Sequence, residues 1–184
     1  MKKTKETELL KTPVFTVVKK EFQGMNFTPV GINCKDWVMI IALDSTDLKK
    51  ANTVFVRQSR WGIEAKTVEF PCGTVESEDF SDGKDGNKIA ALREFAEETG
   101  IHVPEDKLLK AGEFNPNPAY FNNKMHVYYY IDKNLKKEFE SRSNQNLDEN
   151  EDCEVFMARI GDKTFFDIGL QIAGFCCVRE CLEK

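Results

Sequence analysis

The stretch that most constrains the fold of this chain is residues 69–101, whose second half has the apolar period of a helix. At about 100° per residue, its apolar residues fall on one side and its charged residues on the other. The apolar side contains Ile89, Leu92, Phe95, Ala96 and Thr99, and the charged side contains Arg93, Glu94, Glu97 and Glu98. Gly100 follows at once, and glycine commonly occupies the position just past a helix C-terminus. The pattern predicts an amphipathic helix that ends before Gly100.

The charged side of this helix places two glutamates one turn apart. Glu94 and Glu98 are spaced i,i+4, so their carboxylates stand on one face. Like charges at this spacing destabilise an isolated helix by about 0.2–0.5 kcal/mol, whereas a hard divalent cation would stabilise the pair. Arg93 and Glu97, also i,i+4, can form a pair that orients the other acids. An acidic side is equally typical of a helix face exposed to water, so the helix pattern alone leaves both interpretations open.

This stretch resembles the signature of the Nudix hydrolase family. The signature reads Gly, five residues, Glu, seven residues, then Arg-Glu-(apolar)-x-Glu-Glu-x-Gly-(apolar). Every fixed position of its second half is present here, as Arg93, Glu94, Phe95, Glu97, Glu98, Gly100 and Ile101. The resemblance implies that Glu94 and Glu98 bind metal, while Arg93 and Glu97 belong to the catalytic set as organisers of the site.

The first half of the signature is longer than in the family. Gly73 takes the place of the first glycine, but nineteen residues separate it from Arg93, where the family has thirteen. The extra residues fall within 78–86, a polar, glycine-containing stretch that predicts a lengthened surface loop. The family's glutamate is replaced by Asp79 when counted forward, or by Asp85 when counted back. We expect Asp85 to take its role, since that choice keeps the helix register.

Two further segments resemble the ADP-ribose pyrophosphatase branch of the family. Residues 56–60 and 68–76 match its (apolar)-x-Gln-x-Arg and Glu-(apolar)-Pro-Ala-Gly-x-(apolar)-Glu patterns, with Cys72 in place of Ala. The resemblance implies that Arg60 and Thr74 contact substrate and that the backbone carbonyl of Cys72 ligates metal. A surface charge on a strand is the simpler interpretation of Arg60.

Two loops extend this resemblance. Asn117, Pro118 and Ala119 stand where the branch has a Ser-Pro-Gly loop that helps to form the substrate pocket, although a plain turn would also explain them. The acidic run 148–152 stands where relatives carry acid/base and metal-binding glutamates. This implies Glu149 as the general base and Glu151 as a metal ligand, the alternative being a loop that only aids solubility.

Composition limits the class of protein. The chain has 184 residues, 41% of them hydrophobic and 31% charged, which suits one globular domain. Its net charge of −5 argues against a nucleic-acid polymer as partner, and no apolar run is long enough for a membrane helix. The N-terminus lacks the apolar core of a signal peptide, and the six cysteines show no metal-binding spacing, so we expect a cytoplasmic protein with reduced thiols. With only two histidines, a histidine-based triad is not expected.

The fold implied by the resemblance is the Nudix α/β/α sandwich with a central mixed sheet, preceded by a short N-terminal β-hairpin. We expect residues 1–12 to be a disordered tail and 13–184 a single domain, in which strands within 13–35 form a homodimer, as is common in the ADP-ribose branch. Residues 135–148 are polar and expected to be mobile, and 165–182 have the period of a helix. Further strands are predicted at 36–43, 53–60, 64–70, 107–114 and 125–131.

The reaction implied is attack of water on a pyrophosphate bond, assisted by Mg²⁺ or Mn²⁺. The substrate would be ADP-ribose or a similar nucleoside diphosphate sugar, giving a nucleoside monophosphate and a sugar phosphate. Three alternatives stay open at this point. They are a Nudix hydrolase of a dinucleotide or nucleoside triphosphate, a non-catalytic Nudix module that binds a nucleotide, and a structural or interaction domain.

Overall fold

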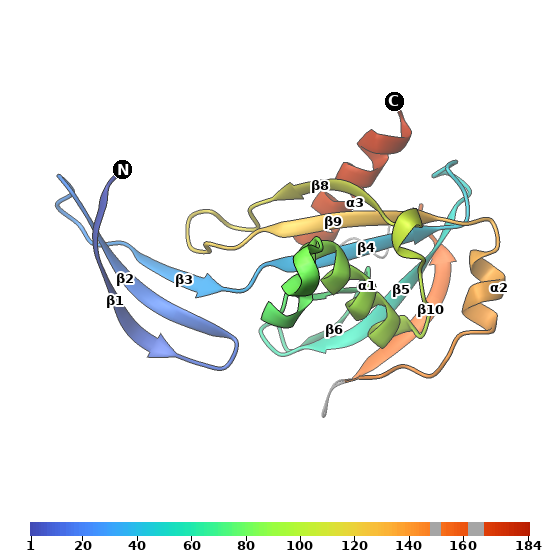
Figure 1. Cartoon of the computed structure of the whole chain (residues 1–184), viewed down its shortest axis with the longest axis horizontal. Helices are drawn as coiled ribbons and strands as arrows, with labels where there is room; N and C mark the ends of the chain where they lie inside the picture. Colours follow the sequence, from blue (N-terminus) through green and yellow to red (C-terminus); the bar gives the residue numbers. More distant parts are fainter. Residues whose placement is uncertain (148–151, 162–167) are drawn as a thin grey trace.

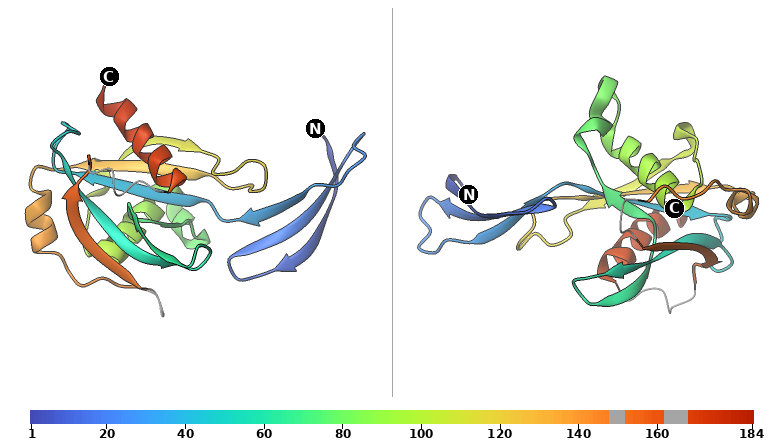
Figure 2. Two further views of the ribbon diagram at one scale, coloured as in Figure 1. Left: turned by 180° about the vertical axis from the view of Figure 1, so that it is seen from behind. Right: turned by 90° about the horizontal axis from the view of Figure 1, so that it is seen from below.

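The strands form two sheets, a small one at the N-terminus and a larger central one (Figure 1). The computed structural model describes residues 1–147, 152–161 and 168–184. The small sheet is antiparallel, in the order β1 (Lys3–Lys11), β2 (Phe15–Phe22) and β3 (Val30–Cys34). It extends away from the rest of the molecule (Figures 1 and 2).

The central sheet is mixed. Its order is β10-β5-β4-β9-β8, with β6 paired to β5 and β7 paired to β4. Strands β4 and β9 are parallel, and the other pairs are antiparallel. The strands are β4 (Trp37–Leu43), β5 (Asn52–Arg60), β6 (Ala65–Glu69), β7 (Cys72–Thr74), β8 (Leu109–Phe114), β9 (Met125–Ile131) and β10 (Cys153–Arg159).

Helices cover both faces of this sheet, which confirms the predicted α/β/α sandwich. Helix α1 (Gly86–Thr99) lies on one face and α3 (Gly169–Leu182) on the other (Figure 2, right). Alternate residues of β4 supply the two layers of the core: Val38 and Ile40 pack with α1, whereas Met39 and Ile41 pack with α3. Burial on both faces explains the unbroken apolar run in this strand. The described residues also form α2 (Leu135–Glu140) and the 3₁₀ turns η1 (Ser77–Gly83) and η2 (Glu105–Lys107).

Two segments differ from the sequence prediction. Residues 1–12, expected as a disordered tail, contain strand β1, which pairs with β2 and extends the predicted hairpin to three strands. Every residue of β1 is exposed, so its pairing depends on backbone hydrogen bonds and on opposite charges across the strands, such as Lys5 opposite Glu21. The stretch expected to be mobile contains α2, which buries Leu135 in the core.

The loop between β8 and β9 contacts the N-terminal sheet. The N–H of Ile32 donates to the carbonyl of Tyr120 at 2.7 Å, and the N–H of Asn122 donates back to the carbonyl of Ile32 at 3.2 Å. None of the six cysteines is in a disulfide. In the part of the chain that the structure describes, no helix has the length and apolar character needed to cross a membrane.

Candidate active site

Helix α1 is the platform of the site, and local signals set both of its ends. At the N-terminus, the Asp85 side chain accepts a hydrogen bond from the N–H of Lys88. At the C-terminus, Gly100 adopts φ 72°, and its N–H donates to the carbonyl of Ala96 at 2.8 Å. The predicted helix, its register and its final glycine are therefore confirmed, and the acidic side of α1 faces β7.

The carboxylate of Glu94 lies directly over the glycine of β7. A Cβ added to Gly73 would lie 2.0 Å from Cδ of Glu94, so only glycine leaves room for this side chain. Glu94 Oε1 accepts hydrogen bonds from the N–H of Thr74 at 3.1 Å and from Arg93 Nη1 at 2.9 Å. Both bonds use Oε1, which leaves the second oxygen beside the Gly73 backbone.

Glu98, one turn further along α1, faces the start of the same strand. Its Oε2 accepts a hydrogen bond from the N–H of Cys72 at 3.0 Å, and the residue is only 3% exposed. Its backbone carbonyl accepts from Gln145 Nε2 at 2.6 Å, which fixes the last turn of α1 to the segment after α2. The two predicted carboxylates therefore converge on the backbone of Cys72–Thr74.

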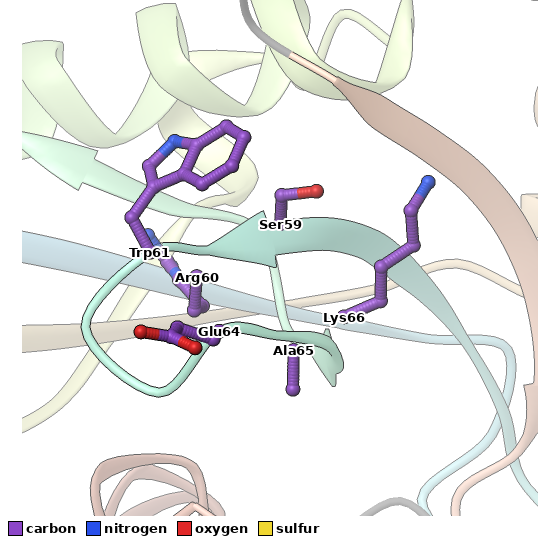
Figure 3. A pocket seen from close by; sticks show the side chains of 6 residues that line it. All are labelled: Ser59, Arg60, Trp61, Glu64, Ala65 and Lys66. Atoms are coloured by element: carbon purple, nitrogen blue, oxygen red, sulfur yellow. The ribbon is translucent and has the colours of Figure 1, made fainter.

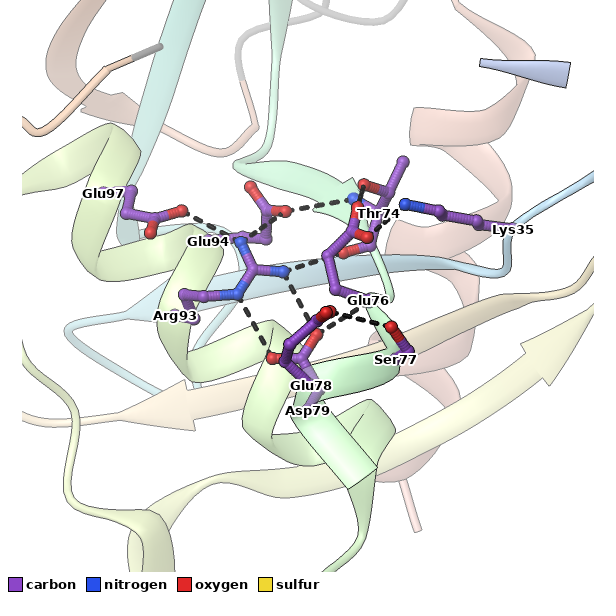
Figure 4. A network of polar contacts seen from close by, with 9 residues as sticks. All are labelled: Lys35, Thr74, Glu76, Ser77, Glu78, Asp79, Arg93, Glu94 and Glu97. Carbon is purple, nitrogen blue, oxygen red and sulfur yellow. Dashed lines mark hydrogen bonds and ion pairs between the residues drawn. The ribbon is translucent and has the colours of Figure 1, made fainter. Parts of the chain in front are cut away.

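Arg93 is the centre of the polar network shown in Figure 4. Its Nη1 donates to Glu94 and, at 3.0 Å, to Glu97 Oε2, while Nη2 donates to the carbonyl of Thr74 at 2.9 Å. Asp79 accepts both remaining bonds, from Nε at 3.2 Å and from Nη2 at 3.1 Å. Arg93 thus ties α1 to β7 and to the turn η1.

The choice of Asp85 over Asp79 as the replacement for the family's glutamate is wrong. Asp79 is 5% exposed and holds Arg93 in a two-pronged ion pair, whereas Asp85 is exposed and caps the helix. Asp79 also accepts a hydrogen bond from the N–H of Glu76 at 2.8 Å. The extra residues form the second half of the turn η1 and its exit, between Asp79 and the helix, which agrees with the count forward from Gly73.

Burial and charge act in opposite directions on the ionisable groups of this network. Burial raises the pKa of Glu94 above its ordinary value, and the charge and hydrogen bond of Arg93 only partly offset it. For Arg93, burial lowers the pKa, but Asp79 and Glu94 outweigh it and the net shift is upward. Arg93 is therefore a permanent cation, and Glu94 is a carboxylate whose charged form is favoured by any additional positive charge nearby.

The donor set fits a hard divalent cation, although the side chains described do not complete a site. Across residues 1–147, 152–161 and 168–184, no group of three or more His, Cys, Asp or Glu side chains is arranged to hold a metal. The carboxylates of Glu94 and Glu98 and the carbonyl of Cys72 are oxygen donors of the type that Mg²⁺ binds. The other predicted ligand, Glu151, and the predicted base, Glu149, lie outside the described residues.

Arg60 lies at the end of β5, with its side chain beside Cys72 of β7. Its guanidinium forms a two-pronged ion pair with Glu69, Nε to Oε1 at 2.6 Å and Nη2 to Oε2 at 2.7 Å, and Nη2 is 3.8 Å from Cys72 Sγ. Burial alone would raise the pKa of Glu69, but Arg60 overrides it and the net shift is downward. Guanidinium carries five N–H donors, so Arg60 retains donors for a phosphate. Its 42% exposed side chain keeps them accessible.

A shallow pocket of about 260 Å³ lies over the turn from β5 to β6 (Figure 3). Arg60 and Lys66 line it together with Trp61, which is 82% exposed. Lys66 forms an ion pair with Asp152 at 2.9 Å, so the residue that follows the predicted catalytic loop contacts this hairpin. The exposed indole of Trp61 at this turn offers a flat apolar surface on which an aromatic ring can stack.

The structure brings some predicted substrate residues to the site and not others. Thr74 is in β7, where its backbone contacts both Glu94 and Arg93 and its hydroxyl donates to Glu76 at 2.9 Å. Asn117, Pro118 and Ala119 are exposed in the β8–β9 loop, where Asn117 Oδ1 accepts from the N–H of Ala119 at 3.3 Å. That loop contacts β3 rather than α1.

Sequence reasoning missed several residues of the site. Asp79 was recoverable by the forward count from Gly73. Glu69 and Trp61 lie within or beside the motifs, but the pairing of Arg60 with Glu69 required the β5–β6 register. Gln171, which contacts Glu69 from α3, has no local signal at all, since the two residues are 102 positions apart.

Comparisons with known proteins identify the family and the fold. The family model of the NUDIX domain matches residues 35–160, a span that runs from β4 through β10. Among solved structures, "Crystal structure of ADP compounds hydrolase" is similar over 100% of this chain and 95% of that chain, with a TM-score of 0.68 and 21% sequence identity. At this identity the likeness shows the fold. No curated protein sequence gives a match.

Proposed function

Because the chain belongs to the Nudix family, whose domain spans residues 35–160, we propose that it hydrolyses the pyrophosphate bond of ADP-ribose or a similar nucleoside diphosphate sugar. The products would be a nucleoside monophosphate and a sugar phosphate. The observation that carries the proposal is the convergence of the Glu94 and Glu98 carboxylates on the backbone of β7, held there by Arg93. The similar fold of an ADP compounds hydrolase supports the choice of substrate class.

Nudix hydrolases generally use divalent metal cations, and we propose Mg²⁺ here, with Mn²⁺ as a substitute. Glu94, Glu98, the Cys72 carbonyl and Glu151 would hold the metal. When bound, the cation would neutralise the diphosphate charge and lower the pKa of a water molecule. Arg93 and Glu97 keep the carboxylates oriented, because Arg93 bonds to Glu94 and Glu97 at once.

The remaining catalytic and binding roles are proposed from the family resemblance and from the residues around the β5–β6 turn. Glu149 would accept the proton of the attacking water, as its place in the acidic run 148–152 implies by resemblance. Arg60 would bind a phosphate, and Trp61 would stack on the nucleobase. Thr74 would contact the substrate near the acids of α1.

We further propose a homodimer formed through the N-terminal sheet. Strand β1 is an exposed edge, and unpaired strand edges are prone to pair with another chain. The sheet also exposes several large apolar side chains, namely Leu9, Leu10, Phe15 and Val30. In a dimer, residues 117–119 could serve the site of the partner subunit, since their loop contacts β3 rather than α1 of their own chain.

Product analysis on a panel of diphosphates tests this function. Purified protein is incubated with ADP-ribose, a nucleotide sugar, a dinucleotide and a nucleoside triphosphate in the presence of Mg²⁺, and products are identified by phosphorus NMR. We expect AMP and ribose 5-phosphate from ADP-ribose. Preferential cleavage of the dinucleotide or triphosphate would redirect the assignment within the family. Binding of nucleotides without any turnover would indicate a non-catalytic module.

A further inference from the structure

One polar side chain of α3, Gln171, is buried against the connection between β6 and β7. Gln171 is 2% exposed, although it belongs to a helix that otherwise buries small or apolar residues at Gly174 and Val178. The helix lies very close to the sheet at this end, since a Cβ on Gly174 would lie 2.3 Å from Met39 Sδ. Burial of an amide side chain is unfavourable unless its polar atoms are paired. The partners of Gln171 therefore explain its position.

Gln171 uses both ends of its amide, and both partners lead toward the site. Its Oε1 accepts a hydrogen bond from the N–H of Phe70 at 2.7 Å, and its Nε2 donates to Glu69 Oε2 at 3.1 Å. Glu69 Oε2 is the same oxygen that accepts from Arg60 Nη2. The Gln171 amide thus bonds both to the backbone of Phe70 and to the Arg60–Glu69 ion pair.

The main chain needs such a partner where it passes from β6 to β7. Residues 70 and 71 belong to neither strand. The carbonyl of Pro71 accepts from the N–H of Ile40 at 3.0 Å, and the N–H of Cys72 donates to Glu98. Gln171 supplies the remaining anchor at Phe70, two residues before the Cys72 carbonyl.

We propose that Gln171 is a positioning residue that couples α3 to the site through two arms, one for each end of its amide, although Nε2 also lies 4.0 Å from Cys72 Sγ. One arm runs through Glu69 to Arg60 and sets how well the substrate binds. The other arm runs through the Phe70 backbone to Cys72 and sets the rate of the chemical step. The inference rests on the proposed function, because it assigns Arg60 to substrate and the Cys72 carbonyl to metal.

Two substitutions separate the arms. Gln171→Glu keeps an oxygen for the Phe70 N–H and places a second carboxyl group against Glu69, so the two either repel or share one proton, and both outcomes weaken the hold of Glu69 on Arg60. We expect it to raise KM for ADP-ribose about tenfold, as the loss of one charged hydrogen bond implies, with kcat within about twofold of wild type. Gln171→Met has a similar length and neither hydrogen-bonding group. It should raise KM to a similar extent and also lower kcat about tenfold.

A packing variant on the same helix gives the matched control. Val178→Ala removes buried apolar atoms of α3 and touches neither arm, so it should lower Tm and leave both KM and kcat of the folded enzyme within about twofold. Kinetics are normalised to the folded fraction measured by circular dichroism. If the Gln171 variants behave like Val178→Ala, with lower Tm and unchanged KM, Gln171 is structural only and the inference is wrong.

Binding without turnover distinguishes this inference from the proposed function. The dissociation constant of ADP is measured by calorimetry for wild type and for Gln171→Glu, and it should rise about tenfold in the variant. Normal wild-type turnover with unaltered ADP binding in the variant rejects the inference alone. A wild-type protein that neither hydrolyses ADP-ribose nor binds ADP rejects the proposed function and the inference together.

Discussion

The carboxylate of Glu94 occupies the space where a side chain at Gly73 would be, with Cδ 2.0 Å from the position of the missing Cβ. The close approach lets Glu94 reach the N–H of Thr74 and stay beside Arg93. The first glycine of the motif thus makes room for Glu94, the first glutamate of the helix motif. Glycine is needed at position 73 because a larger side chain would collide with Glu94, and not because the backbone there adopts a conformation that only glycine allows.

Gly73→Ala should abolish most of the activity. The added methyl would push the Glu94 carboxylate out of its position, while the flexible side chain can move aside and limit the loss of stability to about 1–3 kcal/mol. Gly169→Ala is the control, because a Cβ there has no atom within 4 Å. Steady-state rates and thermal unfolding are measured on both. Near-normal activity of Gly73→Ala would show that Glu94 is not needed where the structure has it.

Asp79→Asn and Asp85→Asn should have unequal effects. Asp79 is buried and pairs with Arg93 twice, so its neutralisation should lower the free energy of unfolding by roughly 1–3 kcal/mol and reduce kcat. Asn is as good a helix N-cap as Asp, so Asp85→Asn should change stability by less than about 0.5 kcal/mol. Urea unfolding of both variants checks the order. Equal losses of stability and of kcat in the two variants would make Asp85 again a candidate for the residue that replaces the family's glutamate.

Glu98→Gln should eliminate turnover and leave the fold intact. The amide oxygen can still accept from the Cys72 N–H, and the loss of one negative charge relieves its repulsion with Glu94, so stability should change by at most about 1 kcal/mol. The exposed Glu180→Gln on α3 serves as control. If Glu98→Gln keeps more than roughly a tenth of wild-type kcat at saturating Mg²⁺, Glu98 is not a metal ligand.

Substitutions of Glu149 and Glu151 in the acidic run should impair activity in different ways. Glu149→Gln should lower kcat by about 10²–10⁴ with little change in metal affinity, as expected for a general base. Glu151→Gln should instead raise the Mg²⁺ concentration needed for half-maximal rate. Metal titrations of both variants separate the roles. Small, equal effects would assign the run to solubility, and Glu97 would become the first candidate for the base.

Oligomeric state tests the role of the N-terminal sheet. Light scattering at micromolar concentration should give twice the chain mass of 21.1 kDa. Leu10→Lys adds a charge to the exposed strand β1 and should shift the protein toward monomer without unfolding the central sheet. Wild type that stays at 21.1 kDa would reject the dimer.

The parts of the fold that the sequence predicted well rest on local rules. The period of α1 and the αL glycine at Gly100 act within one or two turns of helix, so they can be recognised along the chain. The buried strand β4 is recognisable for the same reason, because an unbroken apolar run indicates burial on both faces. The Glu94–Glu98 pair followed from the helical spacing alone.

The tertiary structure decided everything that depends on distant partners. Asp79 and Asp85 both suit the motif by residue type, and only the path of η1 brings Asp79 to Arg93. Strand β1 has no apolar pattern, since its stabilisation comes from pairing with β2 rather than from burial. Gln171 reaches Phe70 across 101 positions because α3 packs against the sheet at Gly174. Such contacts depend on how complete elements pack together, and no local spacing encodes them.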